Sequence, residues 1–158
     1  MKRLTAALCI ALGVATATDG MAADPFTLAI EGPYLLIQAN DYQRVLTFHA
    51  SGAVVQVSDQ QAAIGFTAGQ GAWTQVGADH ATARVVDFSY DLSTGKRAGP
   101  SVIVYDLNFS DLADGKYAKV AGSLSGKVYP PGENPLNPAV APVRTFSVGF
   151  TGQRMTAK

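Results

Sequence analysis

The chain has 158 residues, of which 12 are basic and 12 acidic, and 47% are hydrophobic. A balanced charge without a basic stripe argues against nucleic acid and anionic lipid as partners. The only cysteine, Cys9, lies among the first residues, which excludes disulfides, thiolate metal sites and a cysteine nucleophile from the chain that follows.

Residues 1–23 have the pattern of a secretory signal peptide. Two basic residues precede an apolar run over residues 4–14, and small residues follow. The run is shorter than the about 20 apolar residues that a membrane-spanning helix needs, and no later segment repeats it. We therefore predict cleavage after Ala22 or Ala23 and a periplasmic or extracellular protein without a membrane span. The remaining residues, 24–158, are enough for one compact core, so a single domain is expected.

Period-two runs separated by glycine and aspartate dominate the sequence from residue 43 onward and predict β-strands. No window shows convincing helical spacing, so the predicted class is all-β. In chain order, nine segments have strand character, from which about eight strands are expected. They are residues 26–38, 43–50, 53–59, 63–67, 71–77, 80–91, 101–110, 116–129 and 144–155.

Short polar connections join consecutive strands into hairpins. The turn "SG" and the segments "ADH" and "DLADG" each link two strands in this way. Five of the eight prolines lie in residues 130–142, which predicts a long loop because proline cannot donate to a strand ladder. This loop either covers the mouth of a pocket or simply crosses to the last strand.

A meander of this length has two unpaired edges, and closure into a barrel removes both. We therefore expect a single antiparallel eight-stranded barrel, with a β-sandwich as the alternative. A barrel of this size is either filled by side chains or holds one small ligand.

Alternation gives each major strand one aromatic face, which we expect to point inward, and one more polar face. The side chains assigned to the interior, and therefore the candidate ligand-binding residues, are Phe48, Arg84, Phe88, Tyr90, Tyr105, Phe109, Phe146 and Phe150. Trp73 joins them if its strand is in phase. Core packing alone explains such rings, whereas a pocket would also explain the tyrosines and the arginine among them.

Arg84 shares the phase of these aromatic residues but precedes Tyr90 by about 20 Å of strand. We place it at one mouth of the barrel. There it is either a surface arginine or a docking point for an acidic or carbonyl-bearing ligand.

No catalytic residue, metal site or cofactor is predicted. His49 is expected to face solvent and His80 to lie in a turn, a spacing that does not fit a metal site. Asp87 and Asp106 are expected on polar outer faces as solvated charges.

The segments "LTFHASGAVVQVSDQQ", "GQGAWTQVG", "ARVVDFSYDLSTG", "GKVYPPGENPLNP" and "FSVGFTGQRM" resemble those of a group of secreted, mostly uncharacterised bacterial proteins. These look like calycin-type barrels, similar in shape to lipocalins and to allene oxide cyclase. The resemblance covers residues 43–155 and implies a closed barrel with a hydrophobic cavity, but no established reaction. Lipocalins carry Gly-x-Trp on their first strand. Here the sequence Gly71-Ala72-Trp73 falls in mid-chain, so that role is not transferred to Trp73.

Three hypotheses follow for the function. The favoured one is a secreted or periplasmic barrel that binds a small hydrophobic ligand in an aromatic-lined cavity. A cofactor-free isomerase or cyclase of the allene oxide cyclase type is the alternative, and it is less favoured because no titratable group is clearly predicted to point inward. The third is a packed structural barrel, in which Val85, Val102 and Val104 on the other face form a contact between subunits. A homo-oligomer is therefore left open.

Overall fold

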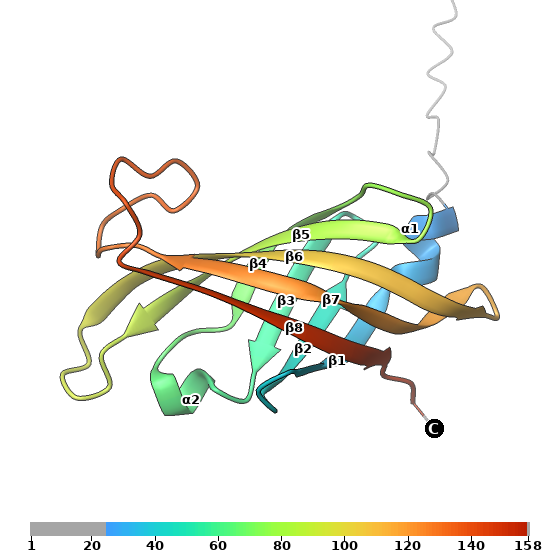
Figure 1. Ribbon diagram of the computed structural model, residues 1–158, viewed down its shortest axis with the longest axis horizontal. Helices are drawn as coiled ribbons and strands as arrows, with labels where there is room; N and C mark the ends of the chain where they lie inside the picture. Colours follow the sequence, from blue (N-terminus) through green and yellow to red (C-terminus); the bar gives the residue numbers. More distant parts are fainter. Residues whose placement is uncertain (1–24, 158) are drawn as a thin grey trace, which may run out of the picture.

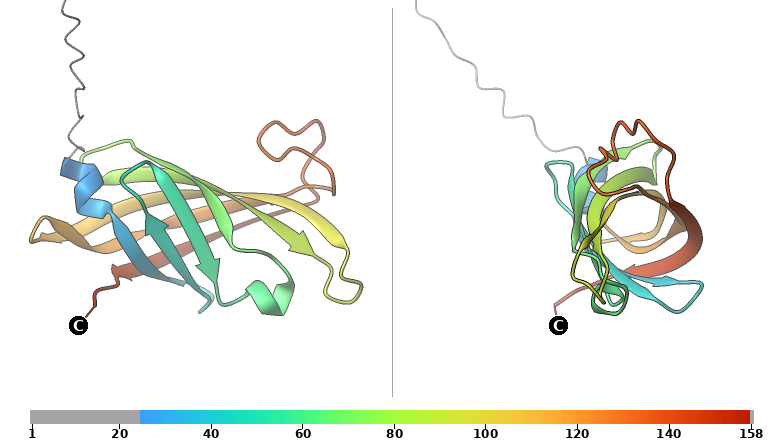
Figure 2. Two further views of the ribbon diagram at one scale, coloured as in Figure 1. Left: turned by 180° about the vertical axis from the view of Figure 1, so that it is seen from behind. Right: turned by 90° about the vertical axis from the view of Figure 1, so that its left-hand side faces the viewer.

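The computed structural model describes residues 25–157. The predicted signal peptide lies outside the described residues. Eight strands follow one another in chain order around a closed antiparallel barrel, as Figures 1 and 2 show. They are β1 (Gly32–Gln38), β2 (Gln43–Phe48), β3 (Ala53–Ser58), β4 (Gly69–Gln75), β5 (His80–Tyr90), β6 (Arg97–Ala113), β7 (Lys116–Val128) and β8 (Arg144–Arg154).

Pairing of the first and last strands closes the barrel. β1 and β8 are antiparallel neighbours, with Tyr34 opposite Arg154 and Gln38 opposite Phe150. No strand of the described barrel is left with an unpaired edge, which removes the risk of edge-to-edge association. The predicted barrel is therefore confirmed over the β-sandwich. The three predicted hairpins and the proline-rich loop before β8 are also present.

Two short helices replace predicted strand segments. Helix α1 (Pro25–Ile30) occupies the start of the region predicted as the first strand, and helix α2 (Gln61–Ile64) occupies part of residues 63–67. In α1 the buried residues Phe26, Ala29 and Ile30 have the spacing of one helical face, a signal that a search for period two does not detect.

The half of the interior next to α1 is a packed aromatic core. Phe109 contacts Phe26, Tyr34 and Phe48 edge to face, with ring centroids 5.6–6.1 Å apart. Trp73 is in phase and lies 6.0 Å from Phe48. Such contacts add to the stabilisation from buried area. These rings therefore fill their half of the barrel as core, and α1 covers that end.

The inner face of β5 is the opposite of the predicted one. Ala81, Ala83, Val85 and Asp87 are buried, whereas Arg84, Phe88 and Tyr90 lie on the outside. Ala83 shows the reason, because it is paired with Trp73 on one side and with Tyr105 on the other. Two large inward rings leave space only for a small side chain between them. The inward assignment of Arg84, Phe88 and Tyr90 was therefore wrong, as was the outward assignment of Val85 and Asp87.

Arg154 connects the last strand, the first strand and α1. Its guanidinium donates to the carbonyl oxygens of Ala29 at 2.6 Å and Glu31 at 2.5 Å, and to the hydroxyl of Tyr34 at 2.8 Å. It also lies 4.8 Å from the centre of the Tyr34 ring. Burial raises the pKa of Tyr34 to about 12, although Arg154 acts to lower it. Arg154 thus holds α1 against the closed barrel.

Replacing Arg154 with methionine should lower the free energy of unfolding by about 2 to 3 kcal/mol, because charge-assisted hydrogen bonds to buried acceptors are lost. Urea denaturation followed by Trp73 fluorescence measures this change, since Trp73 lies 6.4 Å from Phe26 of α1. Arg84→Met, an exposed substitution on β5, is the matched control and should change stability by less than about 0.5 kcal/mol. Equal stabilities of the two variants would contradict the assigned role of Arg154.

Candidate functional site

The end of the barrel away from α1 has a polar interior. Its inner faces carry the side chains of Arg44 on β2, Gln56 on β3, Asp87 on β5 and Tyr105 on β6, which we call the polar cluster. All four residues are at most 5% exposed. Four polar side chains in the interior of so small a barrel need an explanation, because each loses its hydration on folding.

The sequence positions of the polar cluster follow from period two. Arg44 is two residues before Leu46 and four before Phe48, and all three are buried on one face of β2. Gln56 lies two residues after Val54 on β3, opposite Leu46. Asp87 is paired with Ser101 of β6, which is also buried.

Tyr105 and Gln56 are joined by a buried hydrogen bond within the polar cluster. The hydroxyl of Tyr105 donates to Oε1 of Gln56. Burial raises the pKa of Tyr105 well above its usual value, more than the nearby charge of Arg44 lowers it. Tyr105 therefore stays protonated and acts as a hydrogen-bond donor that fixes the orientation of Gln56.

Other polar atoms at this end have no hydrogen-bond partner among residues 25–157. These atoms are Nε and Nη1 of Arg44, Nε2 of Gln56, Oδ1 of Asp87 and Nε2 of Gln38. Gln38 is the next inward residue of β1 after Leu36, which is itself paired with Arg44. An unpaired buried donor or acceptor costs about 1 to 3 kcal/mol, so this arrangement is stabilised by any group that completes it.

Arg44 and Asp87 are opposite charges that do not touch. Within the described part of the chain, the ion pairs are His80 with Asp106 at 2.9 Å and Lys119 with Asp111 at 2.7 Å. Burial raises the pKa of Asp87, while Ser101 and the charge of Arg44 act in the opposite direction. The site thus presents a buried cation beside a carboxyl group that is easier to protonate than an ordinary one.

The eight predicted ligand-binding residues lie on two faces of the barrel wall. Phe48, Tyr105, Phe109 and Phe150 are inward and buried, and Phe146 is inward and half-buried on β8. Phe88 is 55% exposed and Tyr90 is 40% exposed on the outside of β5, and Arg84 lies on the same outer face. The structure therefore does not bring all eight together in one cavity.

Sequence reasoning missed Arg44, Gln56 and the inward position of Asp87. For Arg44 the signal was available, because it shares the phase of Phe48, which was assigned to the interior. For Asp87 the aromatic residues next to it were misleading. His49 is exposed as expected, and His80 begins β5 and bonds to the exposed Asp106.

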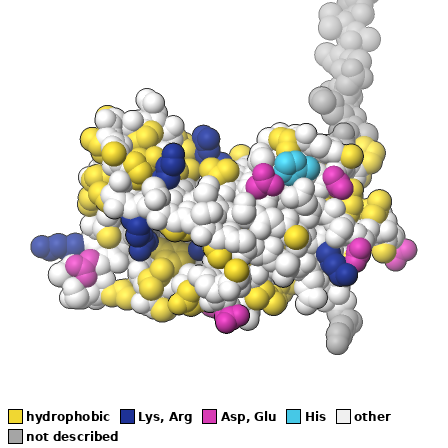
Figure 3. Space-filling model, viewed as in Figure 1, with side chains coloured by type: hydrophobic (Ala, Val, Ile, Leu, Met, Phe, Trp, Pro, Cys, Tyr) yellow, Lys and Arg dark blue, Asp and Glu magenta, His cyan; other side chains and the backbone are white. Residues whose placement is uncertain are grey.

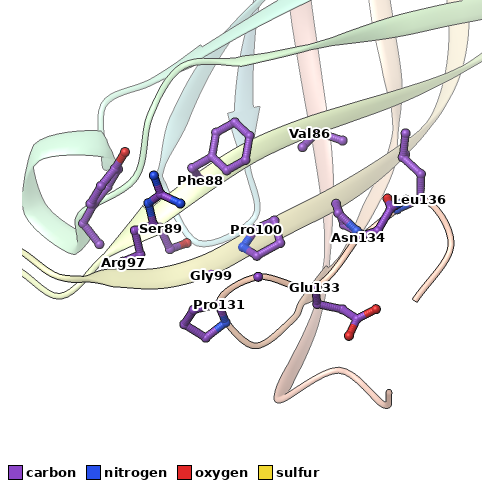
Figure 4. Close-up of a pocket in the computed structure, with 13 residues that line it drawn as sticks. Val86, Phe88, Ser89, Arg97, Gly99, Pro100, Pro131, Glu133, Asn134 and Leu136 are labelled. Atoms are coloured by element: carbon purple, nitrogen blue, oxygen red, sulfur yellow. The ribbon is translucent and has the colours of Figure 1, made fainter. Parts of the chain in front are cut away.

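The exposed aromatic residues of β5 belong to a separate groove on the outside of the barrel. The loop of residues 130–143 stands over this end, where Figure 3 shows hydrophobic side chains together with Lys and Arg. A cavity of about 660 Å³ lies between the loop and the β5–β6 hairpin. Figure 4 shows Val86 and Phe88 of β5, Pro100 of β6 and Leu136 of the loop around it.

The fold and the site define a closed eight-stranded antiparallel barrel with an aromatic core at one end and an incompletely bonded polar cluster at the other. Comparisons of the chain with protein-family models, with curated proteins and with solved structures find no match. Within residues 25–157, no helix has the length and apolar character that crossing a membrane requires. The same residues contain no group of three or more His, Cys, Asp or Glu side chains placed to hold a metal ion.

The raised pKa of Asp87 predicts a pH-dependent stability. The folded protein binds this proton more tightly than the unfolded chain, so the contribution of Asp87 is greatest below the ordinary pKa of 3.8 and is lost as the pH rises through the raised folded pKa. Asp87→Asn removes this loss. The stability of the variant relative to the wild type should therefore increase as the pH rises through that window and then level off.

Urea denaturation of both proteins between about pH 4 and about pH 8 measures the difference. Asp79→Asn, a matched substitution at an exposed aspartate, serves as the control and should show no comparable trend. A difference between wild type and Asp87→Asn that does not vary with pH would contradict the assignment.

Proposed function

We propose that the protein is a secreted or periplasmic barrel that binds a small, largely apolar molecule at the polar end of its interior. A carbonyl or carboxylate group of the ligand accepts hydrogen bonds from Arg44. The observation that carries this proposal is the Arg44 guanidinium, which is 5% exposed and has two nitrogens without a hydrogen-bond partner among the described residues. Burial of a guanidinium with unsatisfied donors is costly, and an acceptor group of a ligand offsets that cost.

The balance of donors and acceptors favours this class of ligand. The unpaired atoms of Arg44, Gln38 and Gln56 are nitrogen donors, and only Oδ1 of Asp87 is an oxygen. A group with acceptor oxygens is therefore complementary to the site. A protonated Asp87 would add one more donor, and its raised pKa favours that form.

Apolar side chains next to the polar cluster are suited to the rest of the ligand. Phe146 and Val148 of β8 are inward and half-buried, and both pack against the core. Phe66, which follows α2, lies 6.0 Å from the Arg44 guanidinium. The aromatic core at the α1 end supplies rigidity rather than space.

The resemblance to calycin-type proteins agrees with this proposal. The predicted signal peptide supports secretion. Neither feature identifies the ligand.

Nuclear magnetic resonance tests the site directly. Titration of the ¹⁵N-labelled protein with decanoate, a carboxylate with an apolar chain, should shift the Nε–H signal of Arg44 and the side-chain amide signals of Gln56 in a saturable way. Arg44→Met should weaken binding, read from the Gln56 signals, by at least about ten-fold because a charge-assisted bond is lost.

Arg84→Met is the matched control, because it removes an arginine from the outer face of the same barrel. It should leave the titration of Arg44 and Gln56 unchanged. Since Arg44 forms no ion pair within residues 25–157, Arg44→Met should not unfold the protein, and thermal denaturation checks this. The proposal fails if the Arg44 signal responds neither to decanoate nor to its methyl ketone analogue, 2-undecanone.

A cofactor-free isomerase or cyclase is the second candidate, and one observation favours it. The sequence predicts no inward titratable group, which favours a binding protein, but Asp87, which is 3% exposed, does point inward and has a raised pKa. A carboxyl group tuned in this way suits general acid–base work beside a polarising cation. An enzyme of this kind should lose turnover in Asp87→Asn while ligand binding at Arg44 persists, and turnover that survives this substitution would exclude Asp87 from the chemistry.

A further inference from the structure

The outer groove is a second place where a ligand can be held. It is formed by the outside of β5 and β6 and by the loop of residues 130–143. Its cavity of about 660 Å³ lies within the range of about 300 to 1,000 Å³ that is usual for small-molecule sites. The apolar residues that line it are Val86, Phe88, Pro100, Pro131, Pro135 and Leu136.

The loop is built as a fixed wall rather than an open strap. At its base, the amide of Tyr129 donates to the carbonyl oxygen of Pro100 at 2.9 Å, and a side chain on Gly99 would overlap the backbone of Tyr129. At its far end, the amide of Val143 donates to the carbonyl oxygen of Val128 at 2.8 Å. Both ends of the loop are therefore tied to the barrel.

Hydrogen bonds within the loop shape its middle. The carboxylate of Glu133 accepts from the amide of Ala139 at 2.7 Å, and the side chain of Asn134 accepts from the amide of Leu136 at 3.0 Å. The negative charge of Glu133 is thus used to fold the loop. Leu136, which is 58% exposed, is held over the groove.

The groove continues past Leu136 into a second hollow of about 220 Å³. The two share Pro135 and Leu136, and the second is lined by Arg84 of β5, by Val102 and Val104 of β6, and by Lys127 of β7. Arg84 lies opposite Val104, seven residues along β6 from Arg97 in the first cavity. The path between them is therefore about 23 Å at about 3.3 Å per residue.

The charge in the second hollow is positive. Neither Arg84 nor Lys127 has an ion-pair partner among residues 25–157. Both border the same hollow, whereas the larger cavity has mainly apolar walls. An apolar trough of this length that ends between two unpaired cations is complementary to a long amphipathic anion.

We propose that the outer groove binds one free long-chain fatty acid, with its carboxylate between Arg84 and Lys127 and its chain along Val86 and Phe88 beneath Leu136. This site is separate from the polar cluster, because Phe88 and Asp87 are consecutive residues of β5 on opposite faces of the barrel wall. It stands whether or not the interior binds a ligand.

Fluorescence titration with cis-parinaric acid, followed by competition with oleate, tests the site. The double variant Arg84→Gln/Lys127→Gln should weaken binding by at least about ten-fold, because both charge-assisted bonds are lost. Phe88→Ser should weaken it by about ten-fold, since the apolar contact of the chain with the ring is removed. Oleyl alcohol, which lacks the carboxylate, should compete much less well than oleate.

Matched controls come from the same strands. Lys119→Gln removes an exposed cation at the other end of β7 from Lys127, and Leu112→Ser removes an exposed leucine at the end of β6 away from the groove. Both should bind as the wild type does. All the substituted residues, Lys127 included, are exposed on the outside of the barrel, and circular dichroism checks that each variant is folded.

Three results would overturn the proposal. The first is the absence of saturable binding by the wild type, and the second is equal affinity for oleyl alcohol and oleate. The third is loss of binding in Arg44→Met together with unchanged binding in Phe88→Ser. The last would place the fatty acid in the barrel and leave the proposed function intact. Conversely, an Arg44 Nε–H signal that does not shift, together with fatty-acid binding that is weakened in Phe88→Ser, would refute the interior site and leave the outer groove intact.

Discussion

The limited space inside a closed eight-stranded barrel is the constraint on which this structure depends. The interior accepts large rings only where the facing positions are small. Ala83 lies between Trp73 and Tyr105, and a side chain on Gly126 would overlap the ring of Phe146. The same constraint explains why aromatic residues of β5 lie outside, and it leaves the two ends of the barrel with different characters.

Period two and turn residues were sufficient to predict the barrel, its hairpins and the inner faces of β2, β6 and β8. They were not sufficient for β5, where the larger side chains face outward. Large apolar side chains are usually buried, but in a closed barrel the identity of the neighbours across the ladder decides which face points in. A single sequence does not give those neighbours. The start of the barrel was missed for another reason, because α1 is too short for a clear helical period.

The candidate site was predicted only in part. Arginine was expected to meet an acidic or carbonyl-bearing ligand, and this chemistry fits Arg44 in the interior. Arg84, the arginine for which that ligand was predicted, borders the outer groove instead. The barrel wall at β5 therefore separates two different environments. Inside lies a buried cation beside a carboxyl group, and outside lies an apolar groove with two cations at one end. Asp87 and Phe88 are consecutive residues, so the two environments are adjacent in the sequence although they lie on opposite faces of the barrel wall.

Closure between β1 and β8 has a consequence for how the chain acquires its structure. Every other strand pairing joins neighbours in the sequence, so those contacts form with little loss of chain entropy, whereas Tyr34 and Arg154 come from opposite ends of the chain. The last seam can be completed only when the C-terminal strand is available. Until then β1 has an open ladder, so a protein that emerges N-terminus first is most exposed to strand-mediated association in the interval before β8 arrives.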